Sequence, residues 1–199
     1  MSVFSKVNFR WRVVDIVIAA VLAVACGLAF WGWDTGSVVP SAALHALAPG
    51  LEGLAGGVWL LAAVLVPLVV RKPGAAVFAE IVAATVEFLP GSTWGANDLL
   101  YGLIQGLGAE LVFALFLYSS WNLLTAMLAG AAAGVGLTIL DLIIYYPRAS
   151  IAFDLIYGVT SVISGAVIAG LLSWLLVRAL ARTGALNSFA AGRTSRALV

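Results

Sequence analysis

The sequence contains little charge and almost no cysteine or histidine. Asp, Glu, Lys and Arg make up 10% of its 199 residues, and it has one cysteine, Cys26, and one histidine, His45. A single cysteine cannot form a disulfide within the chain, and one cysteine with one histidine cannot build a typical His/Cys zinc site. We therefore expect no metal site, a buried Cys26 within its apolar run, and a solvated His45 in a loop.

Sequence motifs of several enzyme classes are also absent. The chain has no GxxxxGK[ST] phosphate loop, no HExxH zinc motif and no GxSxG nucleophile elbow. Its net charge is +1 and its basic residues are scattered, so no basic patch with interleaved aromatic residues is available for nucleic acid. We expect no enzyme, no resident cofactor and no nucleic-acid partner.

Apolar residues dominate instead. They make up 63% of the chain, and the mean hydropathy is +1.12, whereas soluble domains are about 45–50% apolar and about 25% charged. A helix needs about 20 residues to cross roughly 30 Å of hydrocarbon. We therefore predict an all-α polytopic membrane protein with six transmembrane helices, embedded in the lipid bilayer, over Trp11–Trp33, Leu54–Val70, Gly74–Leu89, Asp98–Tyr118, Leu123–Tyr146 and Ile151–Leu180.

These six helices are predicted to form one domain over residues 1–184, followed by a disordered tail over 185–199. The first apolar run, 13–33, is too long for the hydrophobic region of a signal peptide, so we expect it to be retained.

The cations predict the orientation. An even number of spans places both termini on the same side, and positive residues accumulate on the cytoplasmic side. One side would hold Lys6, Arg10, Arg12, Arg71, Lys72, Arg178, Arg182, Arg193 and Arg196, and the other only Arg148. We expect a plasma-membrane protein with both termini in the cytoplasm and with the loops 34–53 and 90–97 outside.

Residues 71–118 place polar side chains inside predicted spans. A carboxylate there is costly, so it normally faces a protein interior or a water-filled cavity. Glu80 and Glu87 are seven residues apart and share one helix face. Gln105 and Glu110 point about 140° apart around their helix. We expect Gln105, at the depth of Glu87, to line a pocket, and Glu80 and Glu110 to form its floor or a proton-sharing pair.

Aromatic residues gather near the outer ends of the predicted spans. They are typical of an interfacial belt, and they also suit stacking on a flat cation beside a carboxylate. Trp94 lies between glycines and close to Glu87, and Trp59 begins the second span. We predict that both line the pocket, with a far wall from Asp141, Tyr145 and Tyr157.

Small residues form a stripe on the first span, at Ala19, Ala23 and Gly27. This spacing allows another helix to approach closely. We predict an interface there, with a helix of this chain and another subunit as the two open alternatives.

Several of these segments resemble a known family. The motifs are WRVVDIVIA at 11–19, GGVW at 56–59, RKPGAA at 71–76, E-x-x-AA-x-x-E at 80–87, G-x-x-WG at 91–95 and QGLGAE at 105–110. Together they resemble the YkoE family, the S components of energy-coupling-factor (ECF) transporters. The resemblance implies a six-helix subunit that captures thiamin or its hydroxymethylpyrimidine precursor from outside. It also implies a transmembrane coupling subunit, which would meet the small-residue surface of the first helix, and ATPase subunits that drive uptake.

The buried carboxylates leave a second function open. A proton- or ion-coupled secondary transporter or channel would use them as a relay through the membrane. Uptake by this chain alone would favour that alternative, whereas a coupling subunit and ATPases would favour substrate capture.

Overall fold

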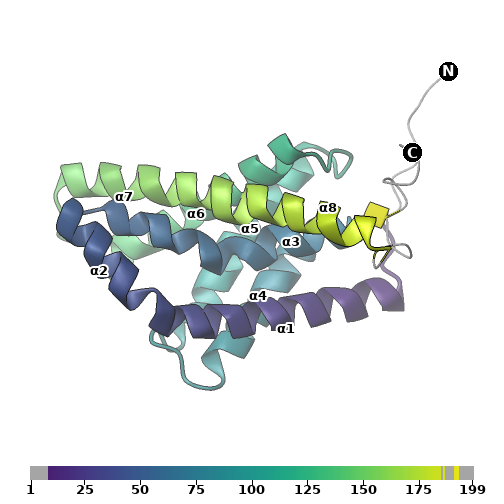
Figure 1. The fold of residues 1–199 in the computed structure, drawn as a ribbon, viewed down its shortest axis with the longest axis horizontal. Coiled ribbons are helices and arrows are strands. Elements are labelled where there is room, and N and C mark those ends of the chain that lie inside the picture. The colour runs from purple at the N-terminus through teal and green to yellow at the C-terminus, as the bar shows by residue number, and fades with distance from the viewer. Residues whose placement is uncertain (1–8, 185, 187–190, 193–199) are drawn as a thin grey trace.

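The computed structural model describes residues 9–184, 186 and 191–192. These residues form a helical bundle without a β-strand among them (Figure 1). The helices are α1 (Val13–Gly36), α2 (Val38–Leu47), η1 (Leu51–Leu60), α3 (Leu61–Val70), α4 (Ala75–Phe88), α5 (Asn97–Leu115), α6 (Leu123–Ile144), α7 (Ile151–Ser164), η2 (Gly165–Leu172) and α8 (Ser173–Arg182).

Six segments run along the bundle, which confirms the predicted all-α polytopic fold. They are α1, η1 with α3, α4, α5, α6, and α7 with η2 and α8. Every one of them except α4 is long and apolar enough to cross a membrane. The 14-residue α4 is shorter, and it packs between α1 and α5. The described chain starts and ends at one end of the bundle, and α2 crosses the other end (Figure 1).

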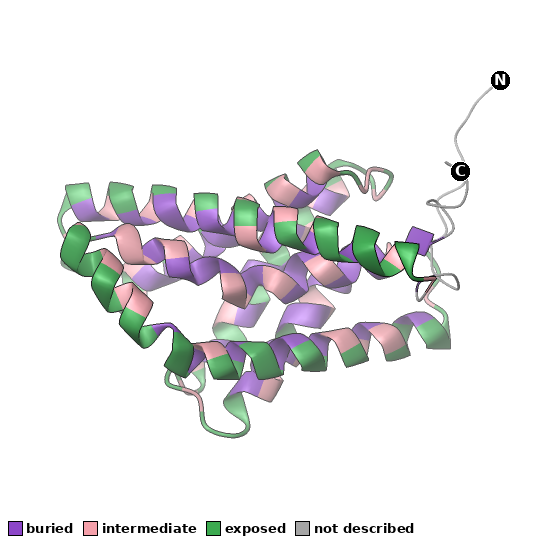
Figure 2. Cartoon of the chain, in the orientation of Figure 1, coloured by how far each residue is buried: buried purple, intermediate pink, exposed green. Residues whose placement is uncertain are grey.

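Exposed residues face outward from the bundle and buried residues face its interior (Figure 2). Many of the exposed residues are large and apolar. Large hydrophobic side chains of α1, such as Val13, Val17 and Leu28, are 79%, 55% and 56% exposed. The interior holds small and branched residues, and Cys26 is buried there as predicted. This inverted distribution is what a bilayer solvent requires, because lipid tails do not penalise exposed apolar side chains.

The second span departs from a regular α-helix. Its first half, η1, is a 3-10 helix, which is tighter and narrower than an α-helix. A Cβ at Gly57 would lie 2.5 Å from the Ser164 backbone oxygen, so the two segments touch at their backbones. The Ser164 hydroxyl accepts from Gly57 N at 2.9 Å and donates to Leu54 O at 2.5 Å. The Ser164 hydroxyl thus supplies hydrogen-bond partners for two backbone groups of η1 from another helix.

The predicted outer loop over 34–53 is wrong in part. The first span continues to Gly36, and residues 38–47 form α2. Apolar residues such as Val38 and Val39 continue the helical pattern after the small Gly36–Ser37 break. His45 of α2 is exposed, and its Nδ1 lies 2.8 Å from Glu52 Oε1.

The small-residue stripe of α1 packs inside the chain. Ala19 and Ala23 are fully buried, and a Cβ at Gly27 would lie 2.4 Å from Ala83 O of α4. The stripe is therefore a contact between α1 and α4, and the alternative of an exposed surface for another subunit does not fit this structure.

Most of the predicted tail over 185–199 lies outside the described residues. Leu186 and Ala191 are described, and both are buried in the apolar core.

Candidate substrate-binding site

A cavity of about 340 Å³ lies at the end of the bundle crossed by α2. Pockets for small molecules typically measure about 300–1,000 Å³. The lining residues Val38, Trp94 and Tyr145 are 62%, 38% and 36% exposed, so the cavity opens where they lie. We call the two segments at this opening, α2 and residues 90–96, the mouth.

The cavity collects most of the acidic residues of the chain. Six of the nine acidic residues line it, and no lysine or arginine does so among the lining residues described. Acidic side chains within low-dielectric walls concentrate a field that attracts cations. The six residues are Asp34, Glu52, Glu80, Glu87, Asp98 and Asp141.

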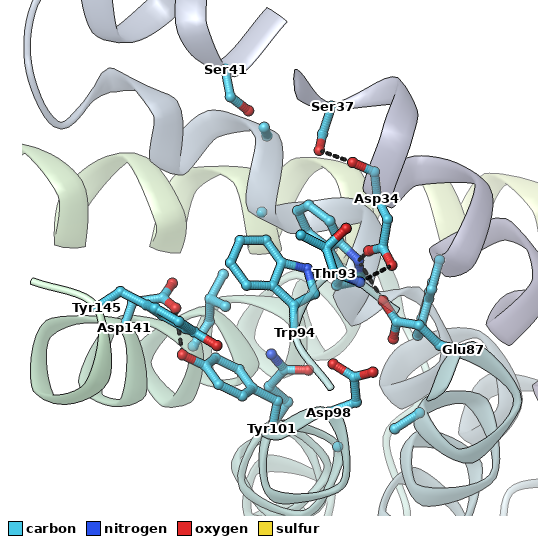
Figure 3. A pocket seen from close by; sticks show the side chains of 18 of the residues that line it. Asp34, Ser37, Ser41, Glu87, Thr93, Trp94, Asp98, Tyr101, Asp141 and Tyr145 are labelled. Carbon is cyan, nitrogen blue, oxygen red and sulfur yellow. Dashed lines mark hydrogen bonds between the residues drawn. The ribbon is translucent and has the colours of Figure 1, made fainter. Parts of the chain in front are cut away.

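Asp34 and Glu87 meet at the indole of Trp59. The Trp59 Nε1 group donates to Glu87 Oε1 at 2.9 Å and to Asp34 Oδ1 at 3.2 Å (Figure 3). Asp34 comes from the last turn of α1, Glu87 from the last turn of α4, and both are nearly fully buried. One neutral donor thus serves two carboxylates, which leaves unused acceptor capacity directed at the cavity.

Trp94 projects over the cavity between other aromatic rings. Its ring centroid lies 6.3 Å from that of Trp59 and 5.2 Å from that of Tyr145, both in edge-to-face geometry. The Ser92 hydroxyl fixes its backbone by accepting from Trp94 N at 3.2 Å and from Gly95 N at 2.9 Å, while donating to the Asp98 carboxylate. An exposed indole face held in this way is suited to stacking on a planar ligand.

The far wall is a carboxylate held by two tyrosines. Asp141 of α6 accepts from Tyr101 OH and from Tyr157 OH, each at 2.5 Å. Tyr145 lies beside them, with its hydroxyl accepting from Asn97 Nδ2 at 3.2 Å and its ring 6.3 Å from that of Tyr101. The hydroxyls orient Asp141, so this wall is rigid and polar.

Gln105 and Glu80 lie deeper. Gln105 lines the cavity and is 3% exposed, yet no described residue makes a hydrogen bond with its side-chain amide. Buried amides normally have partners, so this one is available to a ligand. Glu80 is 1% exposed and accepts from Ala63 N at 2.7 Å, which satisfies a free backbone donor at the start of α3.

Comparisons with known proteins agree with this architecture. A family described as "ABC-type cobalt transport system, permease component" matches residues 14–136. The chain is 36% identical over 184 residues to the HMP/thiamine permease protein YkoE of Bacillus subtilis (strain 168), covering 92% of this chain and 91% of that protein. The chain belongs to the YkoE family. A solved S component of an ECF transporter superposes on this family member with a TM-score of 0.87 at 34% identity, covering 94% of each chain.

This YkoE-family S component is a multi-pass membrane protein and a transporter subunit, not an enzyme. The structure brings every residue predicted for the pocket to the cavity lining, with Glu110 as the exception. Their roles toward a ligand remain predictions. The residues at the lining are Trp59, Glu80, Glu87, Trp94, Gln105, Asp141, Tyr145 and Tyr157.

Glu110 lies at the opposite end of the bundle, so its predicted place in the pocket floor is wrong. Its carboxylate accepts from Gly74 N at 2.6 Å and Ala76 N at 2.9 Å, and from Tyr118 OH at 2.8 Å. It therefore caps α4 from α5, where the free backbone donors of a helix start attract an anion. Burial, and then the bond to Glu110, raise the pKa of Tyr118 to about 12, which keeps its hydroxyl a donor at physiological pH.

We expect Glu110→Ala to destabilise the protein without changing ligand affinity. Loss of a helix cap costs about 0.5–2 kcal/mol, and hydrogen bonds to a charged group contribute about 1.5–3 kcal/mol. A lower midpoint of thermal unfolding in detergent, with an unchanged dissociation constant by calorimetry, would agree with a capping role. A weakened ligand affinity at unchanged stability would contradict it.

Sequence reasoning missed Asp34, Glu52, Asp98 and Tyr101 as lining residues. The loop prediction for Asp34 rests on the end of the first predicted span at Trp33, although the helix continues through Asp34. The signal was present in the pattern F-W-G-W-D at 30–34, where a carboxylate follows two tryptophans on one helix.

Proposed function

We propose that this S component captures a flat organic molecule of the thiamin class, either cationic thiamin itself or its uncharged hydroxymethylpyrimidine precursor. The observation that supports this most is the cavity lining, which combines six acidic residues with tryptophan and tyrosine rings and, among the residues that the structure describes, contains no lysine, arginine or histidine. Thiamin joins an aminopyrimidine to a cationic thiazolium ring, and aromatic faces attract cations. The name of the Bacillus subtilis relative points to the same compounds.

The residues suggest a division of roles. Glu87 would offset the thiazolium charge or bond the aminopyrimidine, and Trp94 would stack on one of the two rings. The free amide of Gln105 offers both a donor and an acceptor to a pyrimidine edge. Asp141, held by its tyrosines, would close the far wall, and Glu80 would form the floor.

The orientation and partners follow from the charge distribution and the family. The cavity end would face outside and both termini the cytoplasm, because the cations gather at the opposite end of the bundle. A transmembrane coupling subunit and ATPase subunits would then drive reorientation and release inward.

An organic ligand fits this cavity better than a metal ion. The description of the matching family names cobalt, but the described residues contain no group of three or more His, Cys, Asp and Glu side chains placed to hold a metal. Cobalt sites in proteins typically use nitrogen and oxygen ligands in such groups.

Titration calorimetry of the purified protein tests the proposal directly. We expect thiamin to bind at micromolar concentration or below, and the uncharged hydroxymethylpyrimidine to bind more weakly because it lacks the cationic ring. Cobalt(II) chloride serves as a third titrant. Absence of heat with both organic ligands would reject the proposal, and binding of cobalt alone would instead favour a metal ion as the substrate.

The alternative of an ion-coupled transporter is tested by reconstitution. The chain alone in liposomes should not accumulate thiamin under a proton or sodium gradient. Accumulation without partner subunits would favour the alternative.

A further inference from the structure

One indole proton in the cavity wall is shared between two carboxylates. The Trp59 indole has a single N–H, which lies 2.9 Å from Glu87 Oε1 and 3.2 Å from Asp34 Oδ1. Such a three-centre bond divides its strength between its acceptors. Any group that draws Glu87 away leaves the Trp59 proton to Asp34 alone.

Asp34 also contacts one segment of the mouth and the residue that precedes the other segment. Its Oδ2 accepts from Thr93 N at 3.4 Å, and its backbone oxygen accepts from the Ser37 hydroxyl at 3.4 Å (Figure 3). Thr93 belongs to residues 90–96, and Ser37 directly precedes α2. The Thr93 bond involves the Asp34 side chain, whereas the Ser37 bond involves the Asp34 backbone oxygen, and both are longer than usual for their type.

No residue of the mouth segments is buried. In residues 90–96, Gly91 and Gly95 adopt φ of +94° and +63°, and a Cβ at either would meet nothing within 4 Å. Segments with few buried contacts have low local stability and move most readily.

We propose that Asp34 is a positioning residue that couples occupancy of the cavity to closure of residues 90–96 of the mouth. The inference rests on the proposed function. A cation bound at Glu87 competes for that carboxylate, so the Trp59 N–H turns to Asp34. Asp34 is then fixed against η1 and holds Thr93 in place, which draws residues 90–96 over the ligand.

Thiol labelling of the mouth tests this coupling in the full chain. Cys26 is replaced by alanine, and Ala96, which is exposed in residues 90–96, is replaced by cysteine as a reporter. We expect saturating thiamin to slow maleimide labelling of the reporter. In Asp34→Asn the slowing should be lost even at saturation, and thiamin should dissociate about tenfold faster, as for a lost charge-assisted hydrogen bond.

Two further variants separate coupling from other roles. Trp59→Phe lacks the shared proton, so thiamin should not slow labelling of the reporter in this variant, as in Asp34→Asn. If Asp34→Asn does not fold, Trp59→Phe provides the test of the coupling. Asp154→Asn, a matched change in the first turn of α7 and outside the cavity lining, should keep the slowing.

Two results in Asp34→Asn would overturn the proposal. If thiamin still slows labelling fully, Asp34 is dispensable for closure. If the slowing returns only with excess thiamin, Asp34 is a direct ligand contact. Failure of the unsubstituted protein to bind thiamin by calorimetry would refute the proposed function instead.

Discussion

Replacement of Glu87 by glutamine is expected to weaken thiamin binding at least about tenfold, equivalent to about 1.4 kcal/mol. Glu87 is 4% exposed and hydrogen-bonds to a neutral indole, and no lysine or arginine among the lining residues offsets its charge. A buried carboxylate interacts with a cation far more strongly than one in water. Glutamine keeps the shape and an oxygen acceptor for Trp59, so the change removes mainly the charge. Calorimetry gives the dissociation constant.

Glu110→Gln is the matched control for this substitution. It makes the same chemical change in a helix of the same bundle, at a carboxylate that caps α4 and lies outside the cavity. Its affinity for thiamin should equal that of the unsubstituted protein. If Glu87→Gln binds thiamin equally well, Glu87 is no part of the site, and if both variants bind weakly, the loss reflects general destabilisation.

The loss of affinity in Glu87→Gln should also depend on the charge of the ligand. If Glu87 offsets the thiazolium, Glu87→Gln should weaken thiamin binding more than hydroxymethylpyrimidine binding. Equal losses would instead assign Glu87 to the aminopyrimidine, which both ligands share.

The fold was predictable because composition and segment length determine which stretches can cross a bilayer. The structure differs from the prediction where tertiary contacts determine the backbone conformation. The 3-10 geometry of η1 depends on Ser164, more than a hundred residues away, which accepts from Gly57. No local pattern around residues 51–60 specifies that partner.

The candidate site was predictable where an acid lies inside an apolar helix. Glu80 and Glu87 both line the cavity, as their seven-residue spacing indicates. Glu110 satisfied the same criterion and lies elsewhere, because the free N–H groups at the start of α4 compete for a carboxylate as a cavity does. A burial cost in lipid shows that an acid has a partner without telling which one.

The stripe at Ala19, Ala23 and Gly27 illustrates the same ambiguity. Small residues at this spacing indicate a close helix neighbour. Only the three-dimensional structure shows that the neighbour is α4 of the same chain, with Ala83 O in the position that a Gly27 side chain would occupy.

Gly130→Ala is expected to be the most damaging single change in the bundle. A Cβ at Gly130 would lie 2.1 Å from the Gly165 oxygen and 2.9 Å from Gly170 N, so it meets backbone and not a movable side chain. Gly165 is equally constrained, since its own Cβ would lie 2.2 Å from Gly130 O. Overpacking usually costs about 1–3 kcal/mol. Because α6 and η2 must separate along their contact, we expect the loss to reach or exceed the upper end of that range.

Gly32→Ala is the control, and it should change the stability of the protein in the opposite direction. Gly32 lies within α1, where a Cβ would meet nothing within 4 Å. Alanine in a helix interior is more favourable than glycine by roughly 0.5–1 kcal/mol. The midpoint of thermal unfolding in detergent should therefore rise slightly for Gly32→Ala and fall sharply for Gly130→Ala, with loss of monodisperse protein. Equal behaviour of the two variants would mean that α6 and η2 do not meet at their backbones, and the position of the cavity wall at Asp141, on the same helix α6, would have to be reconsidered.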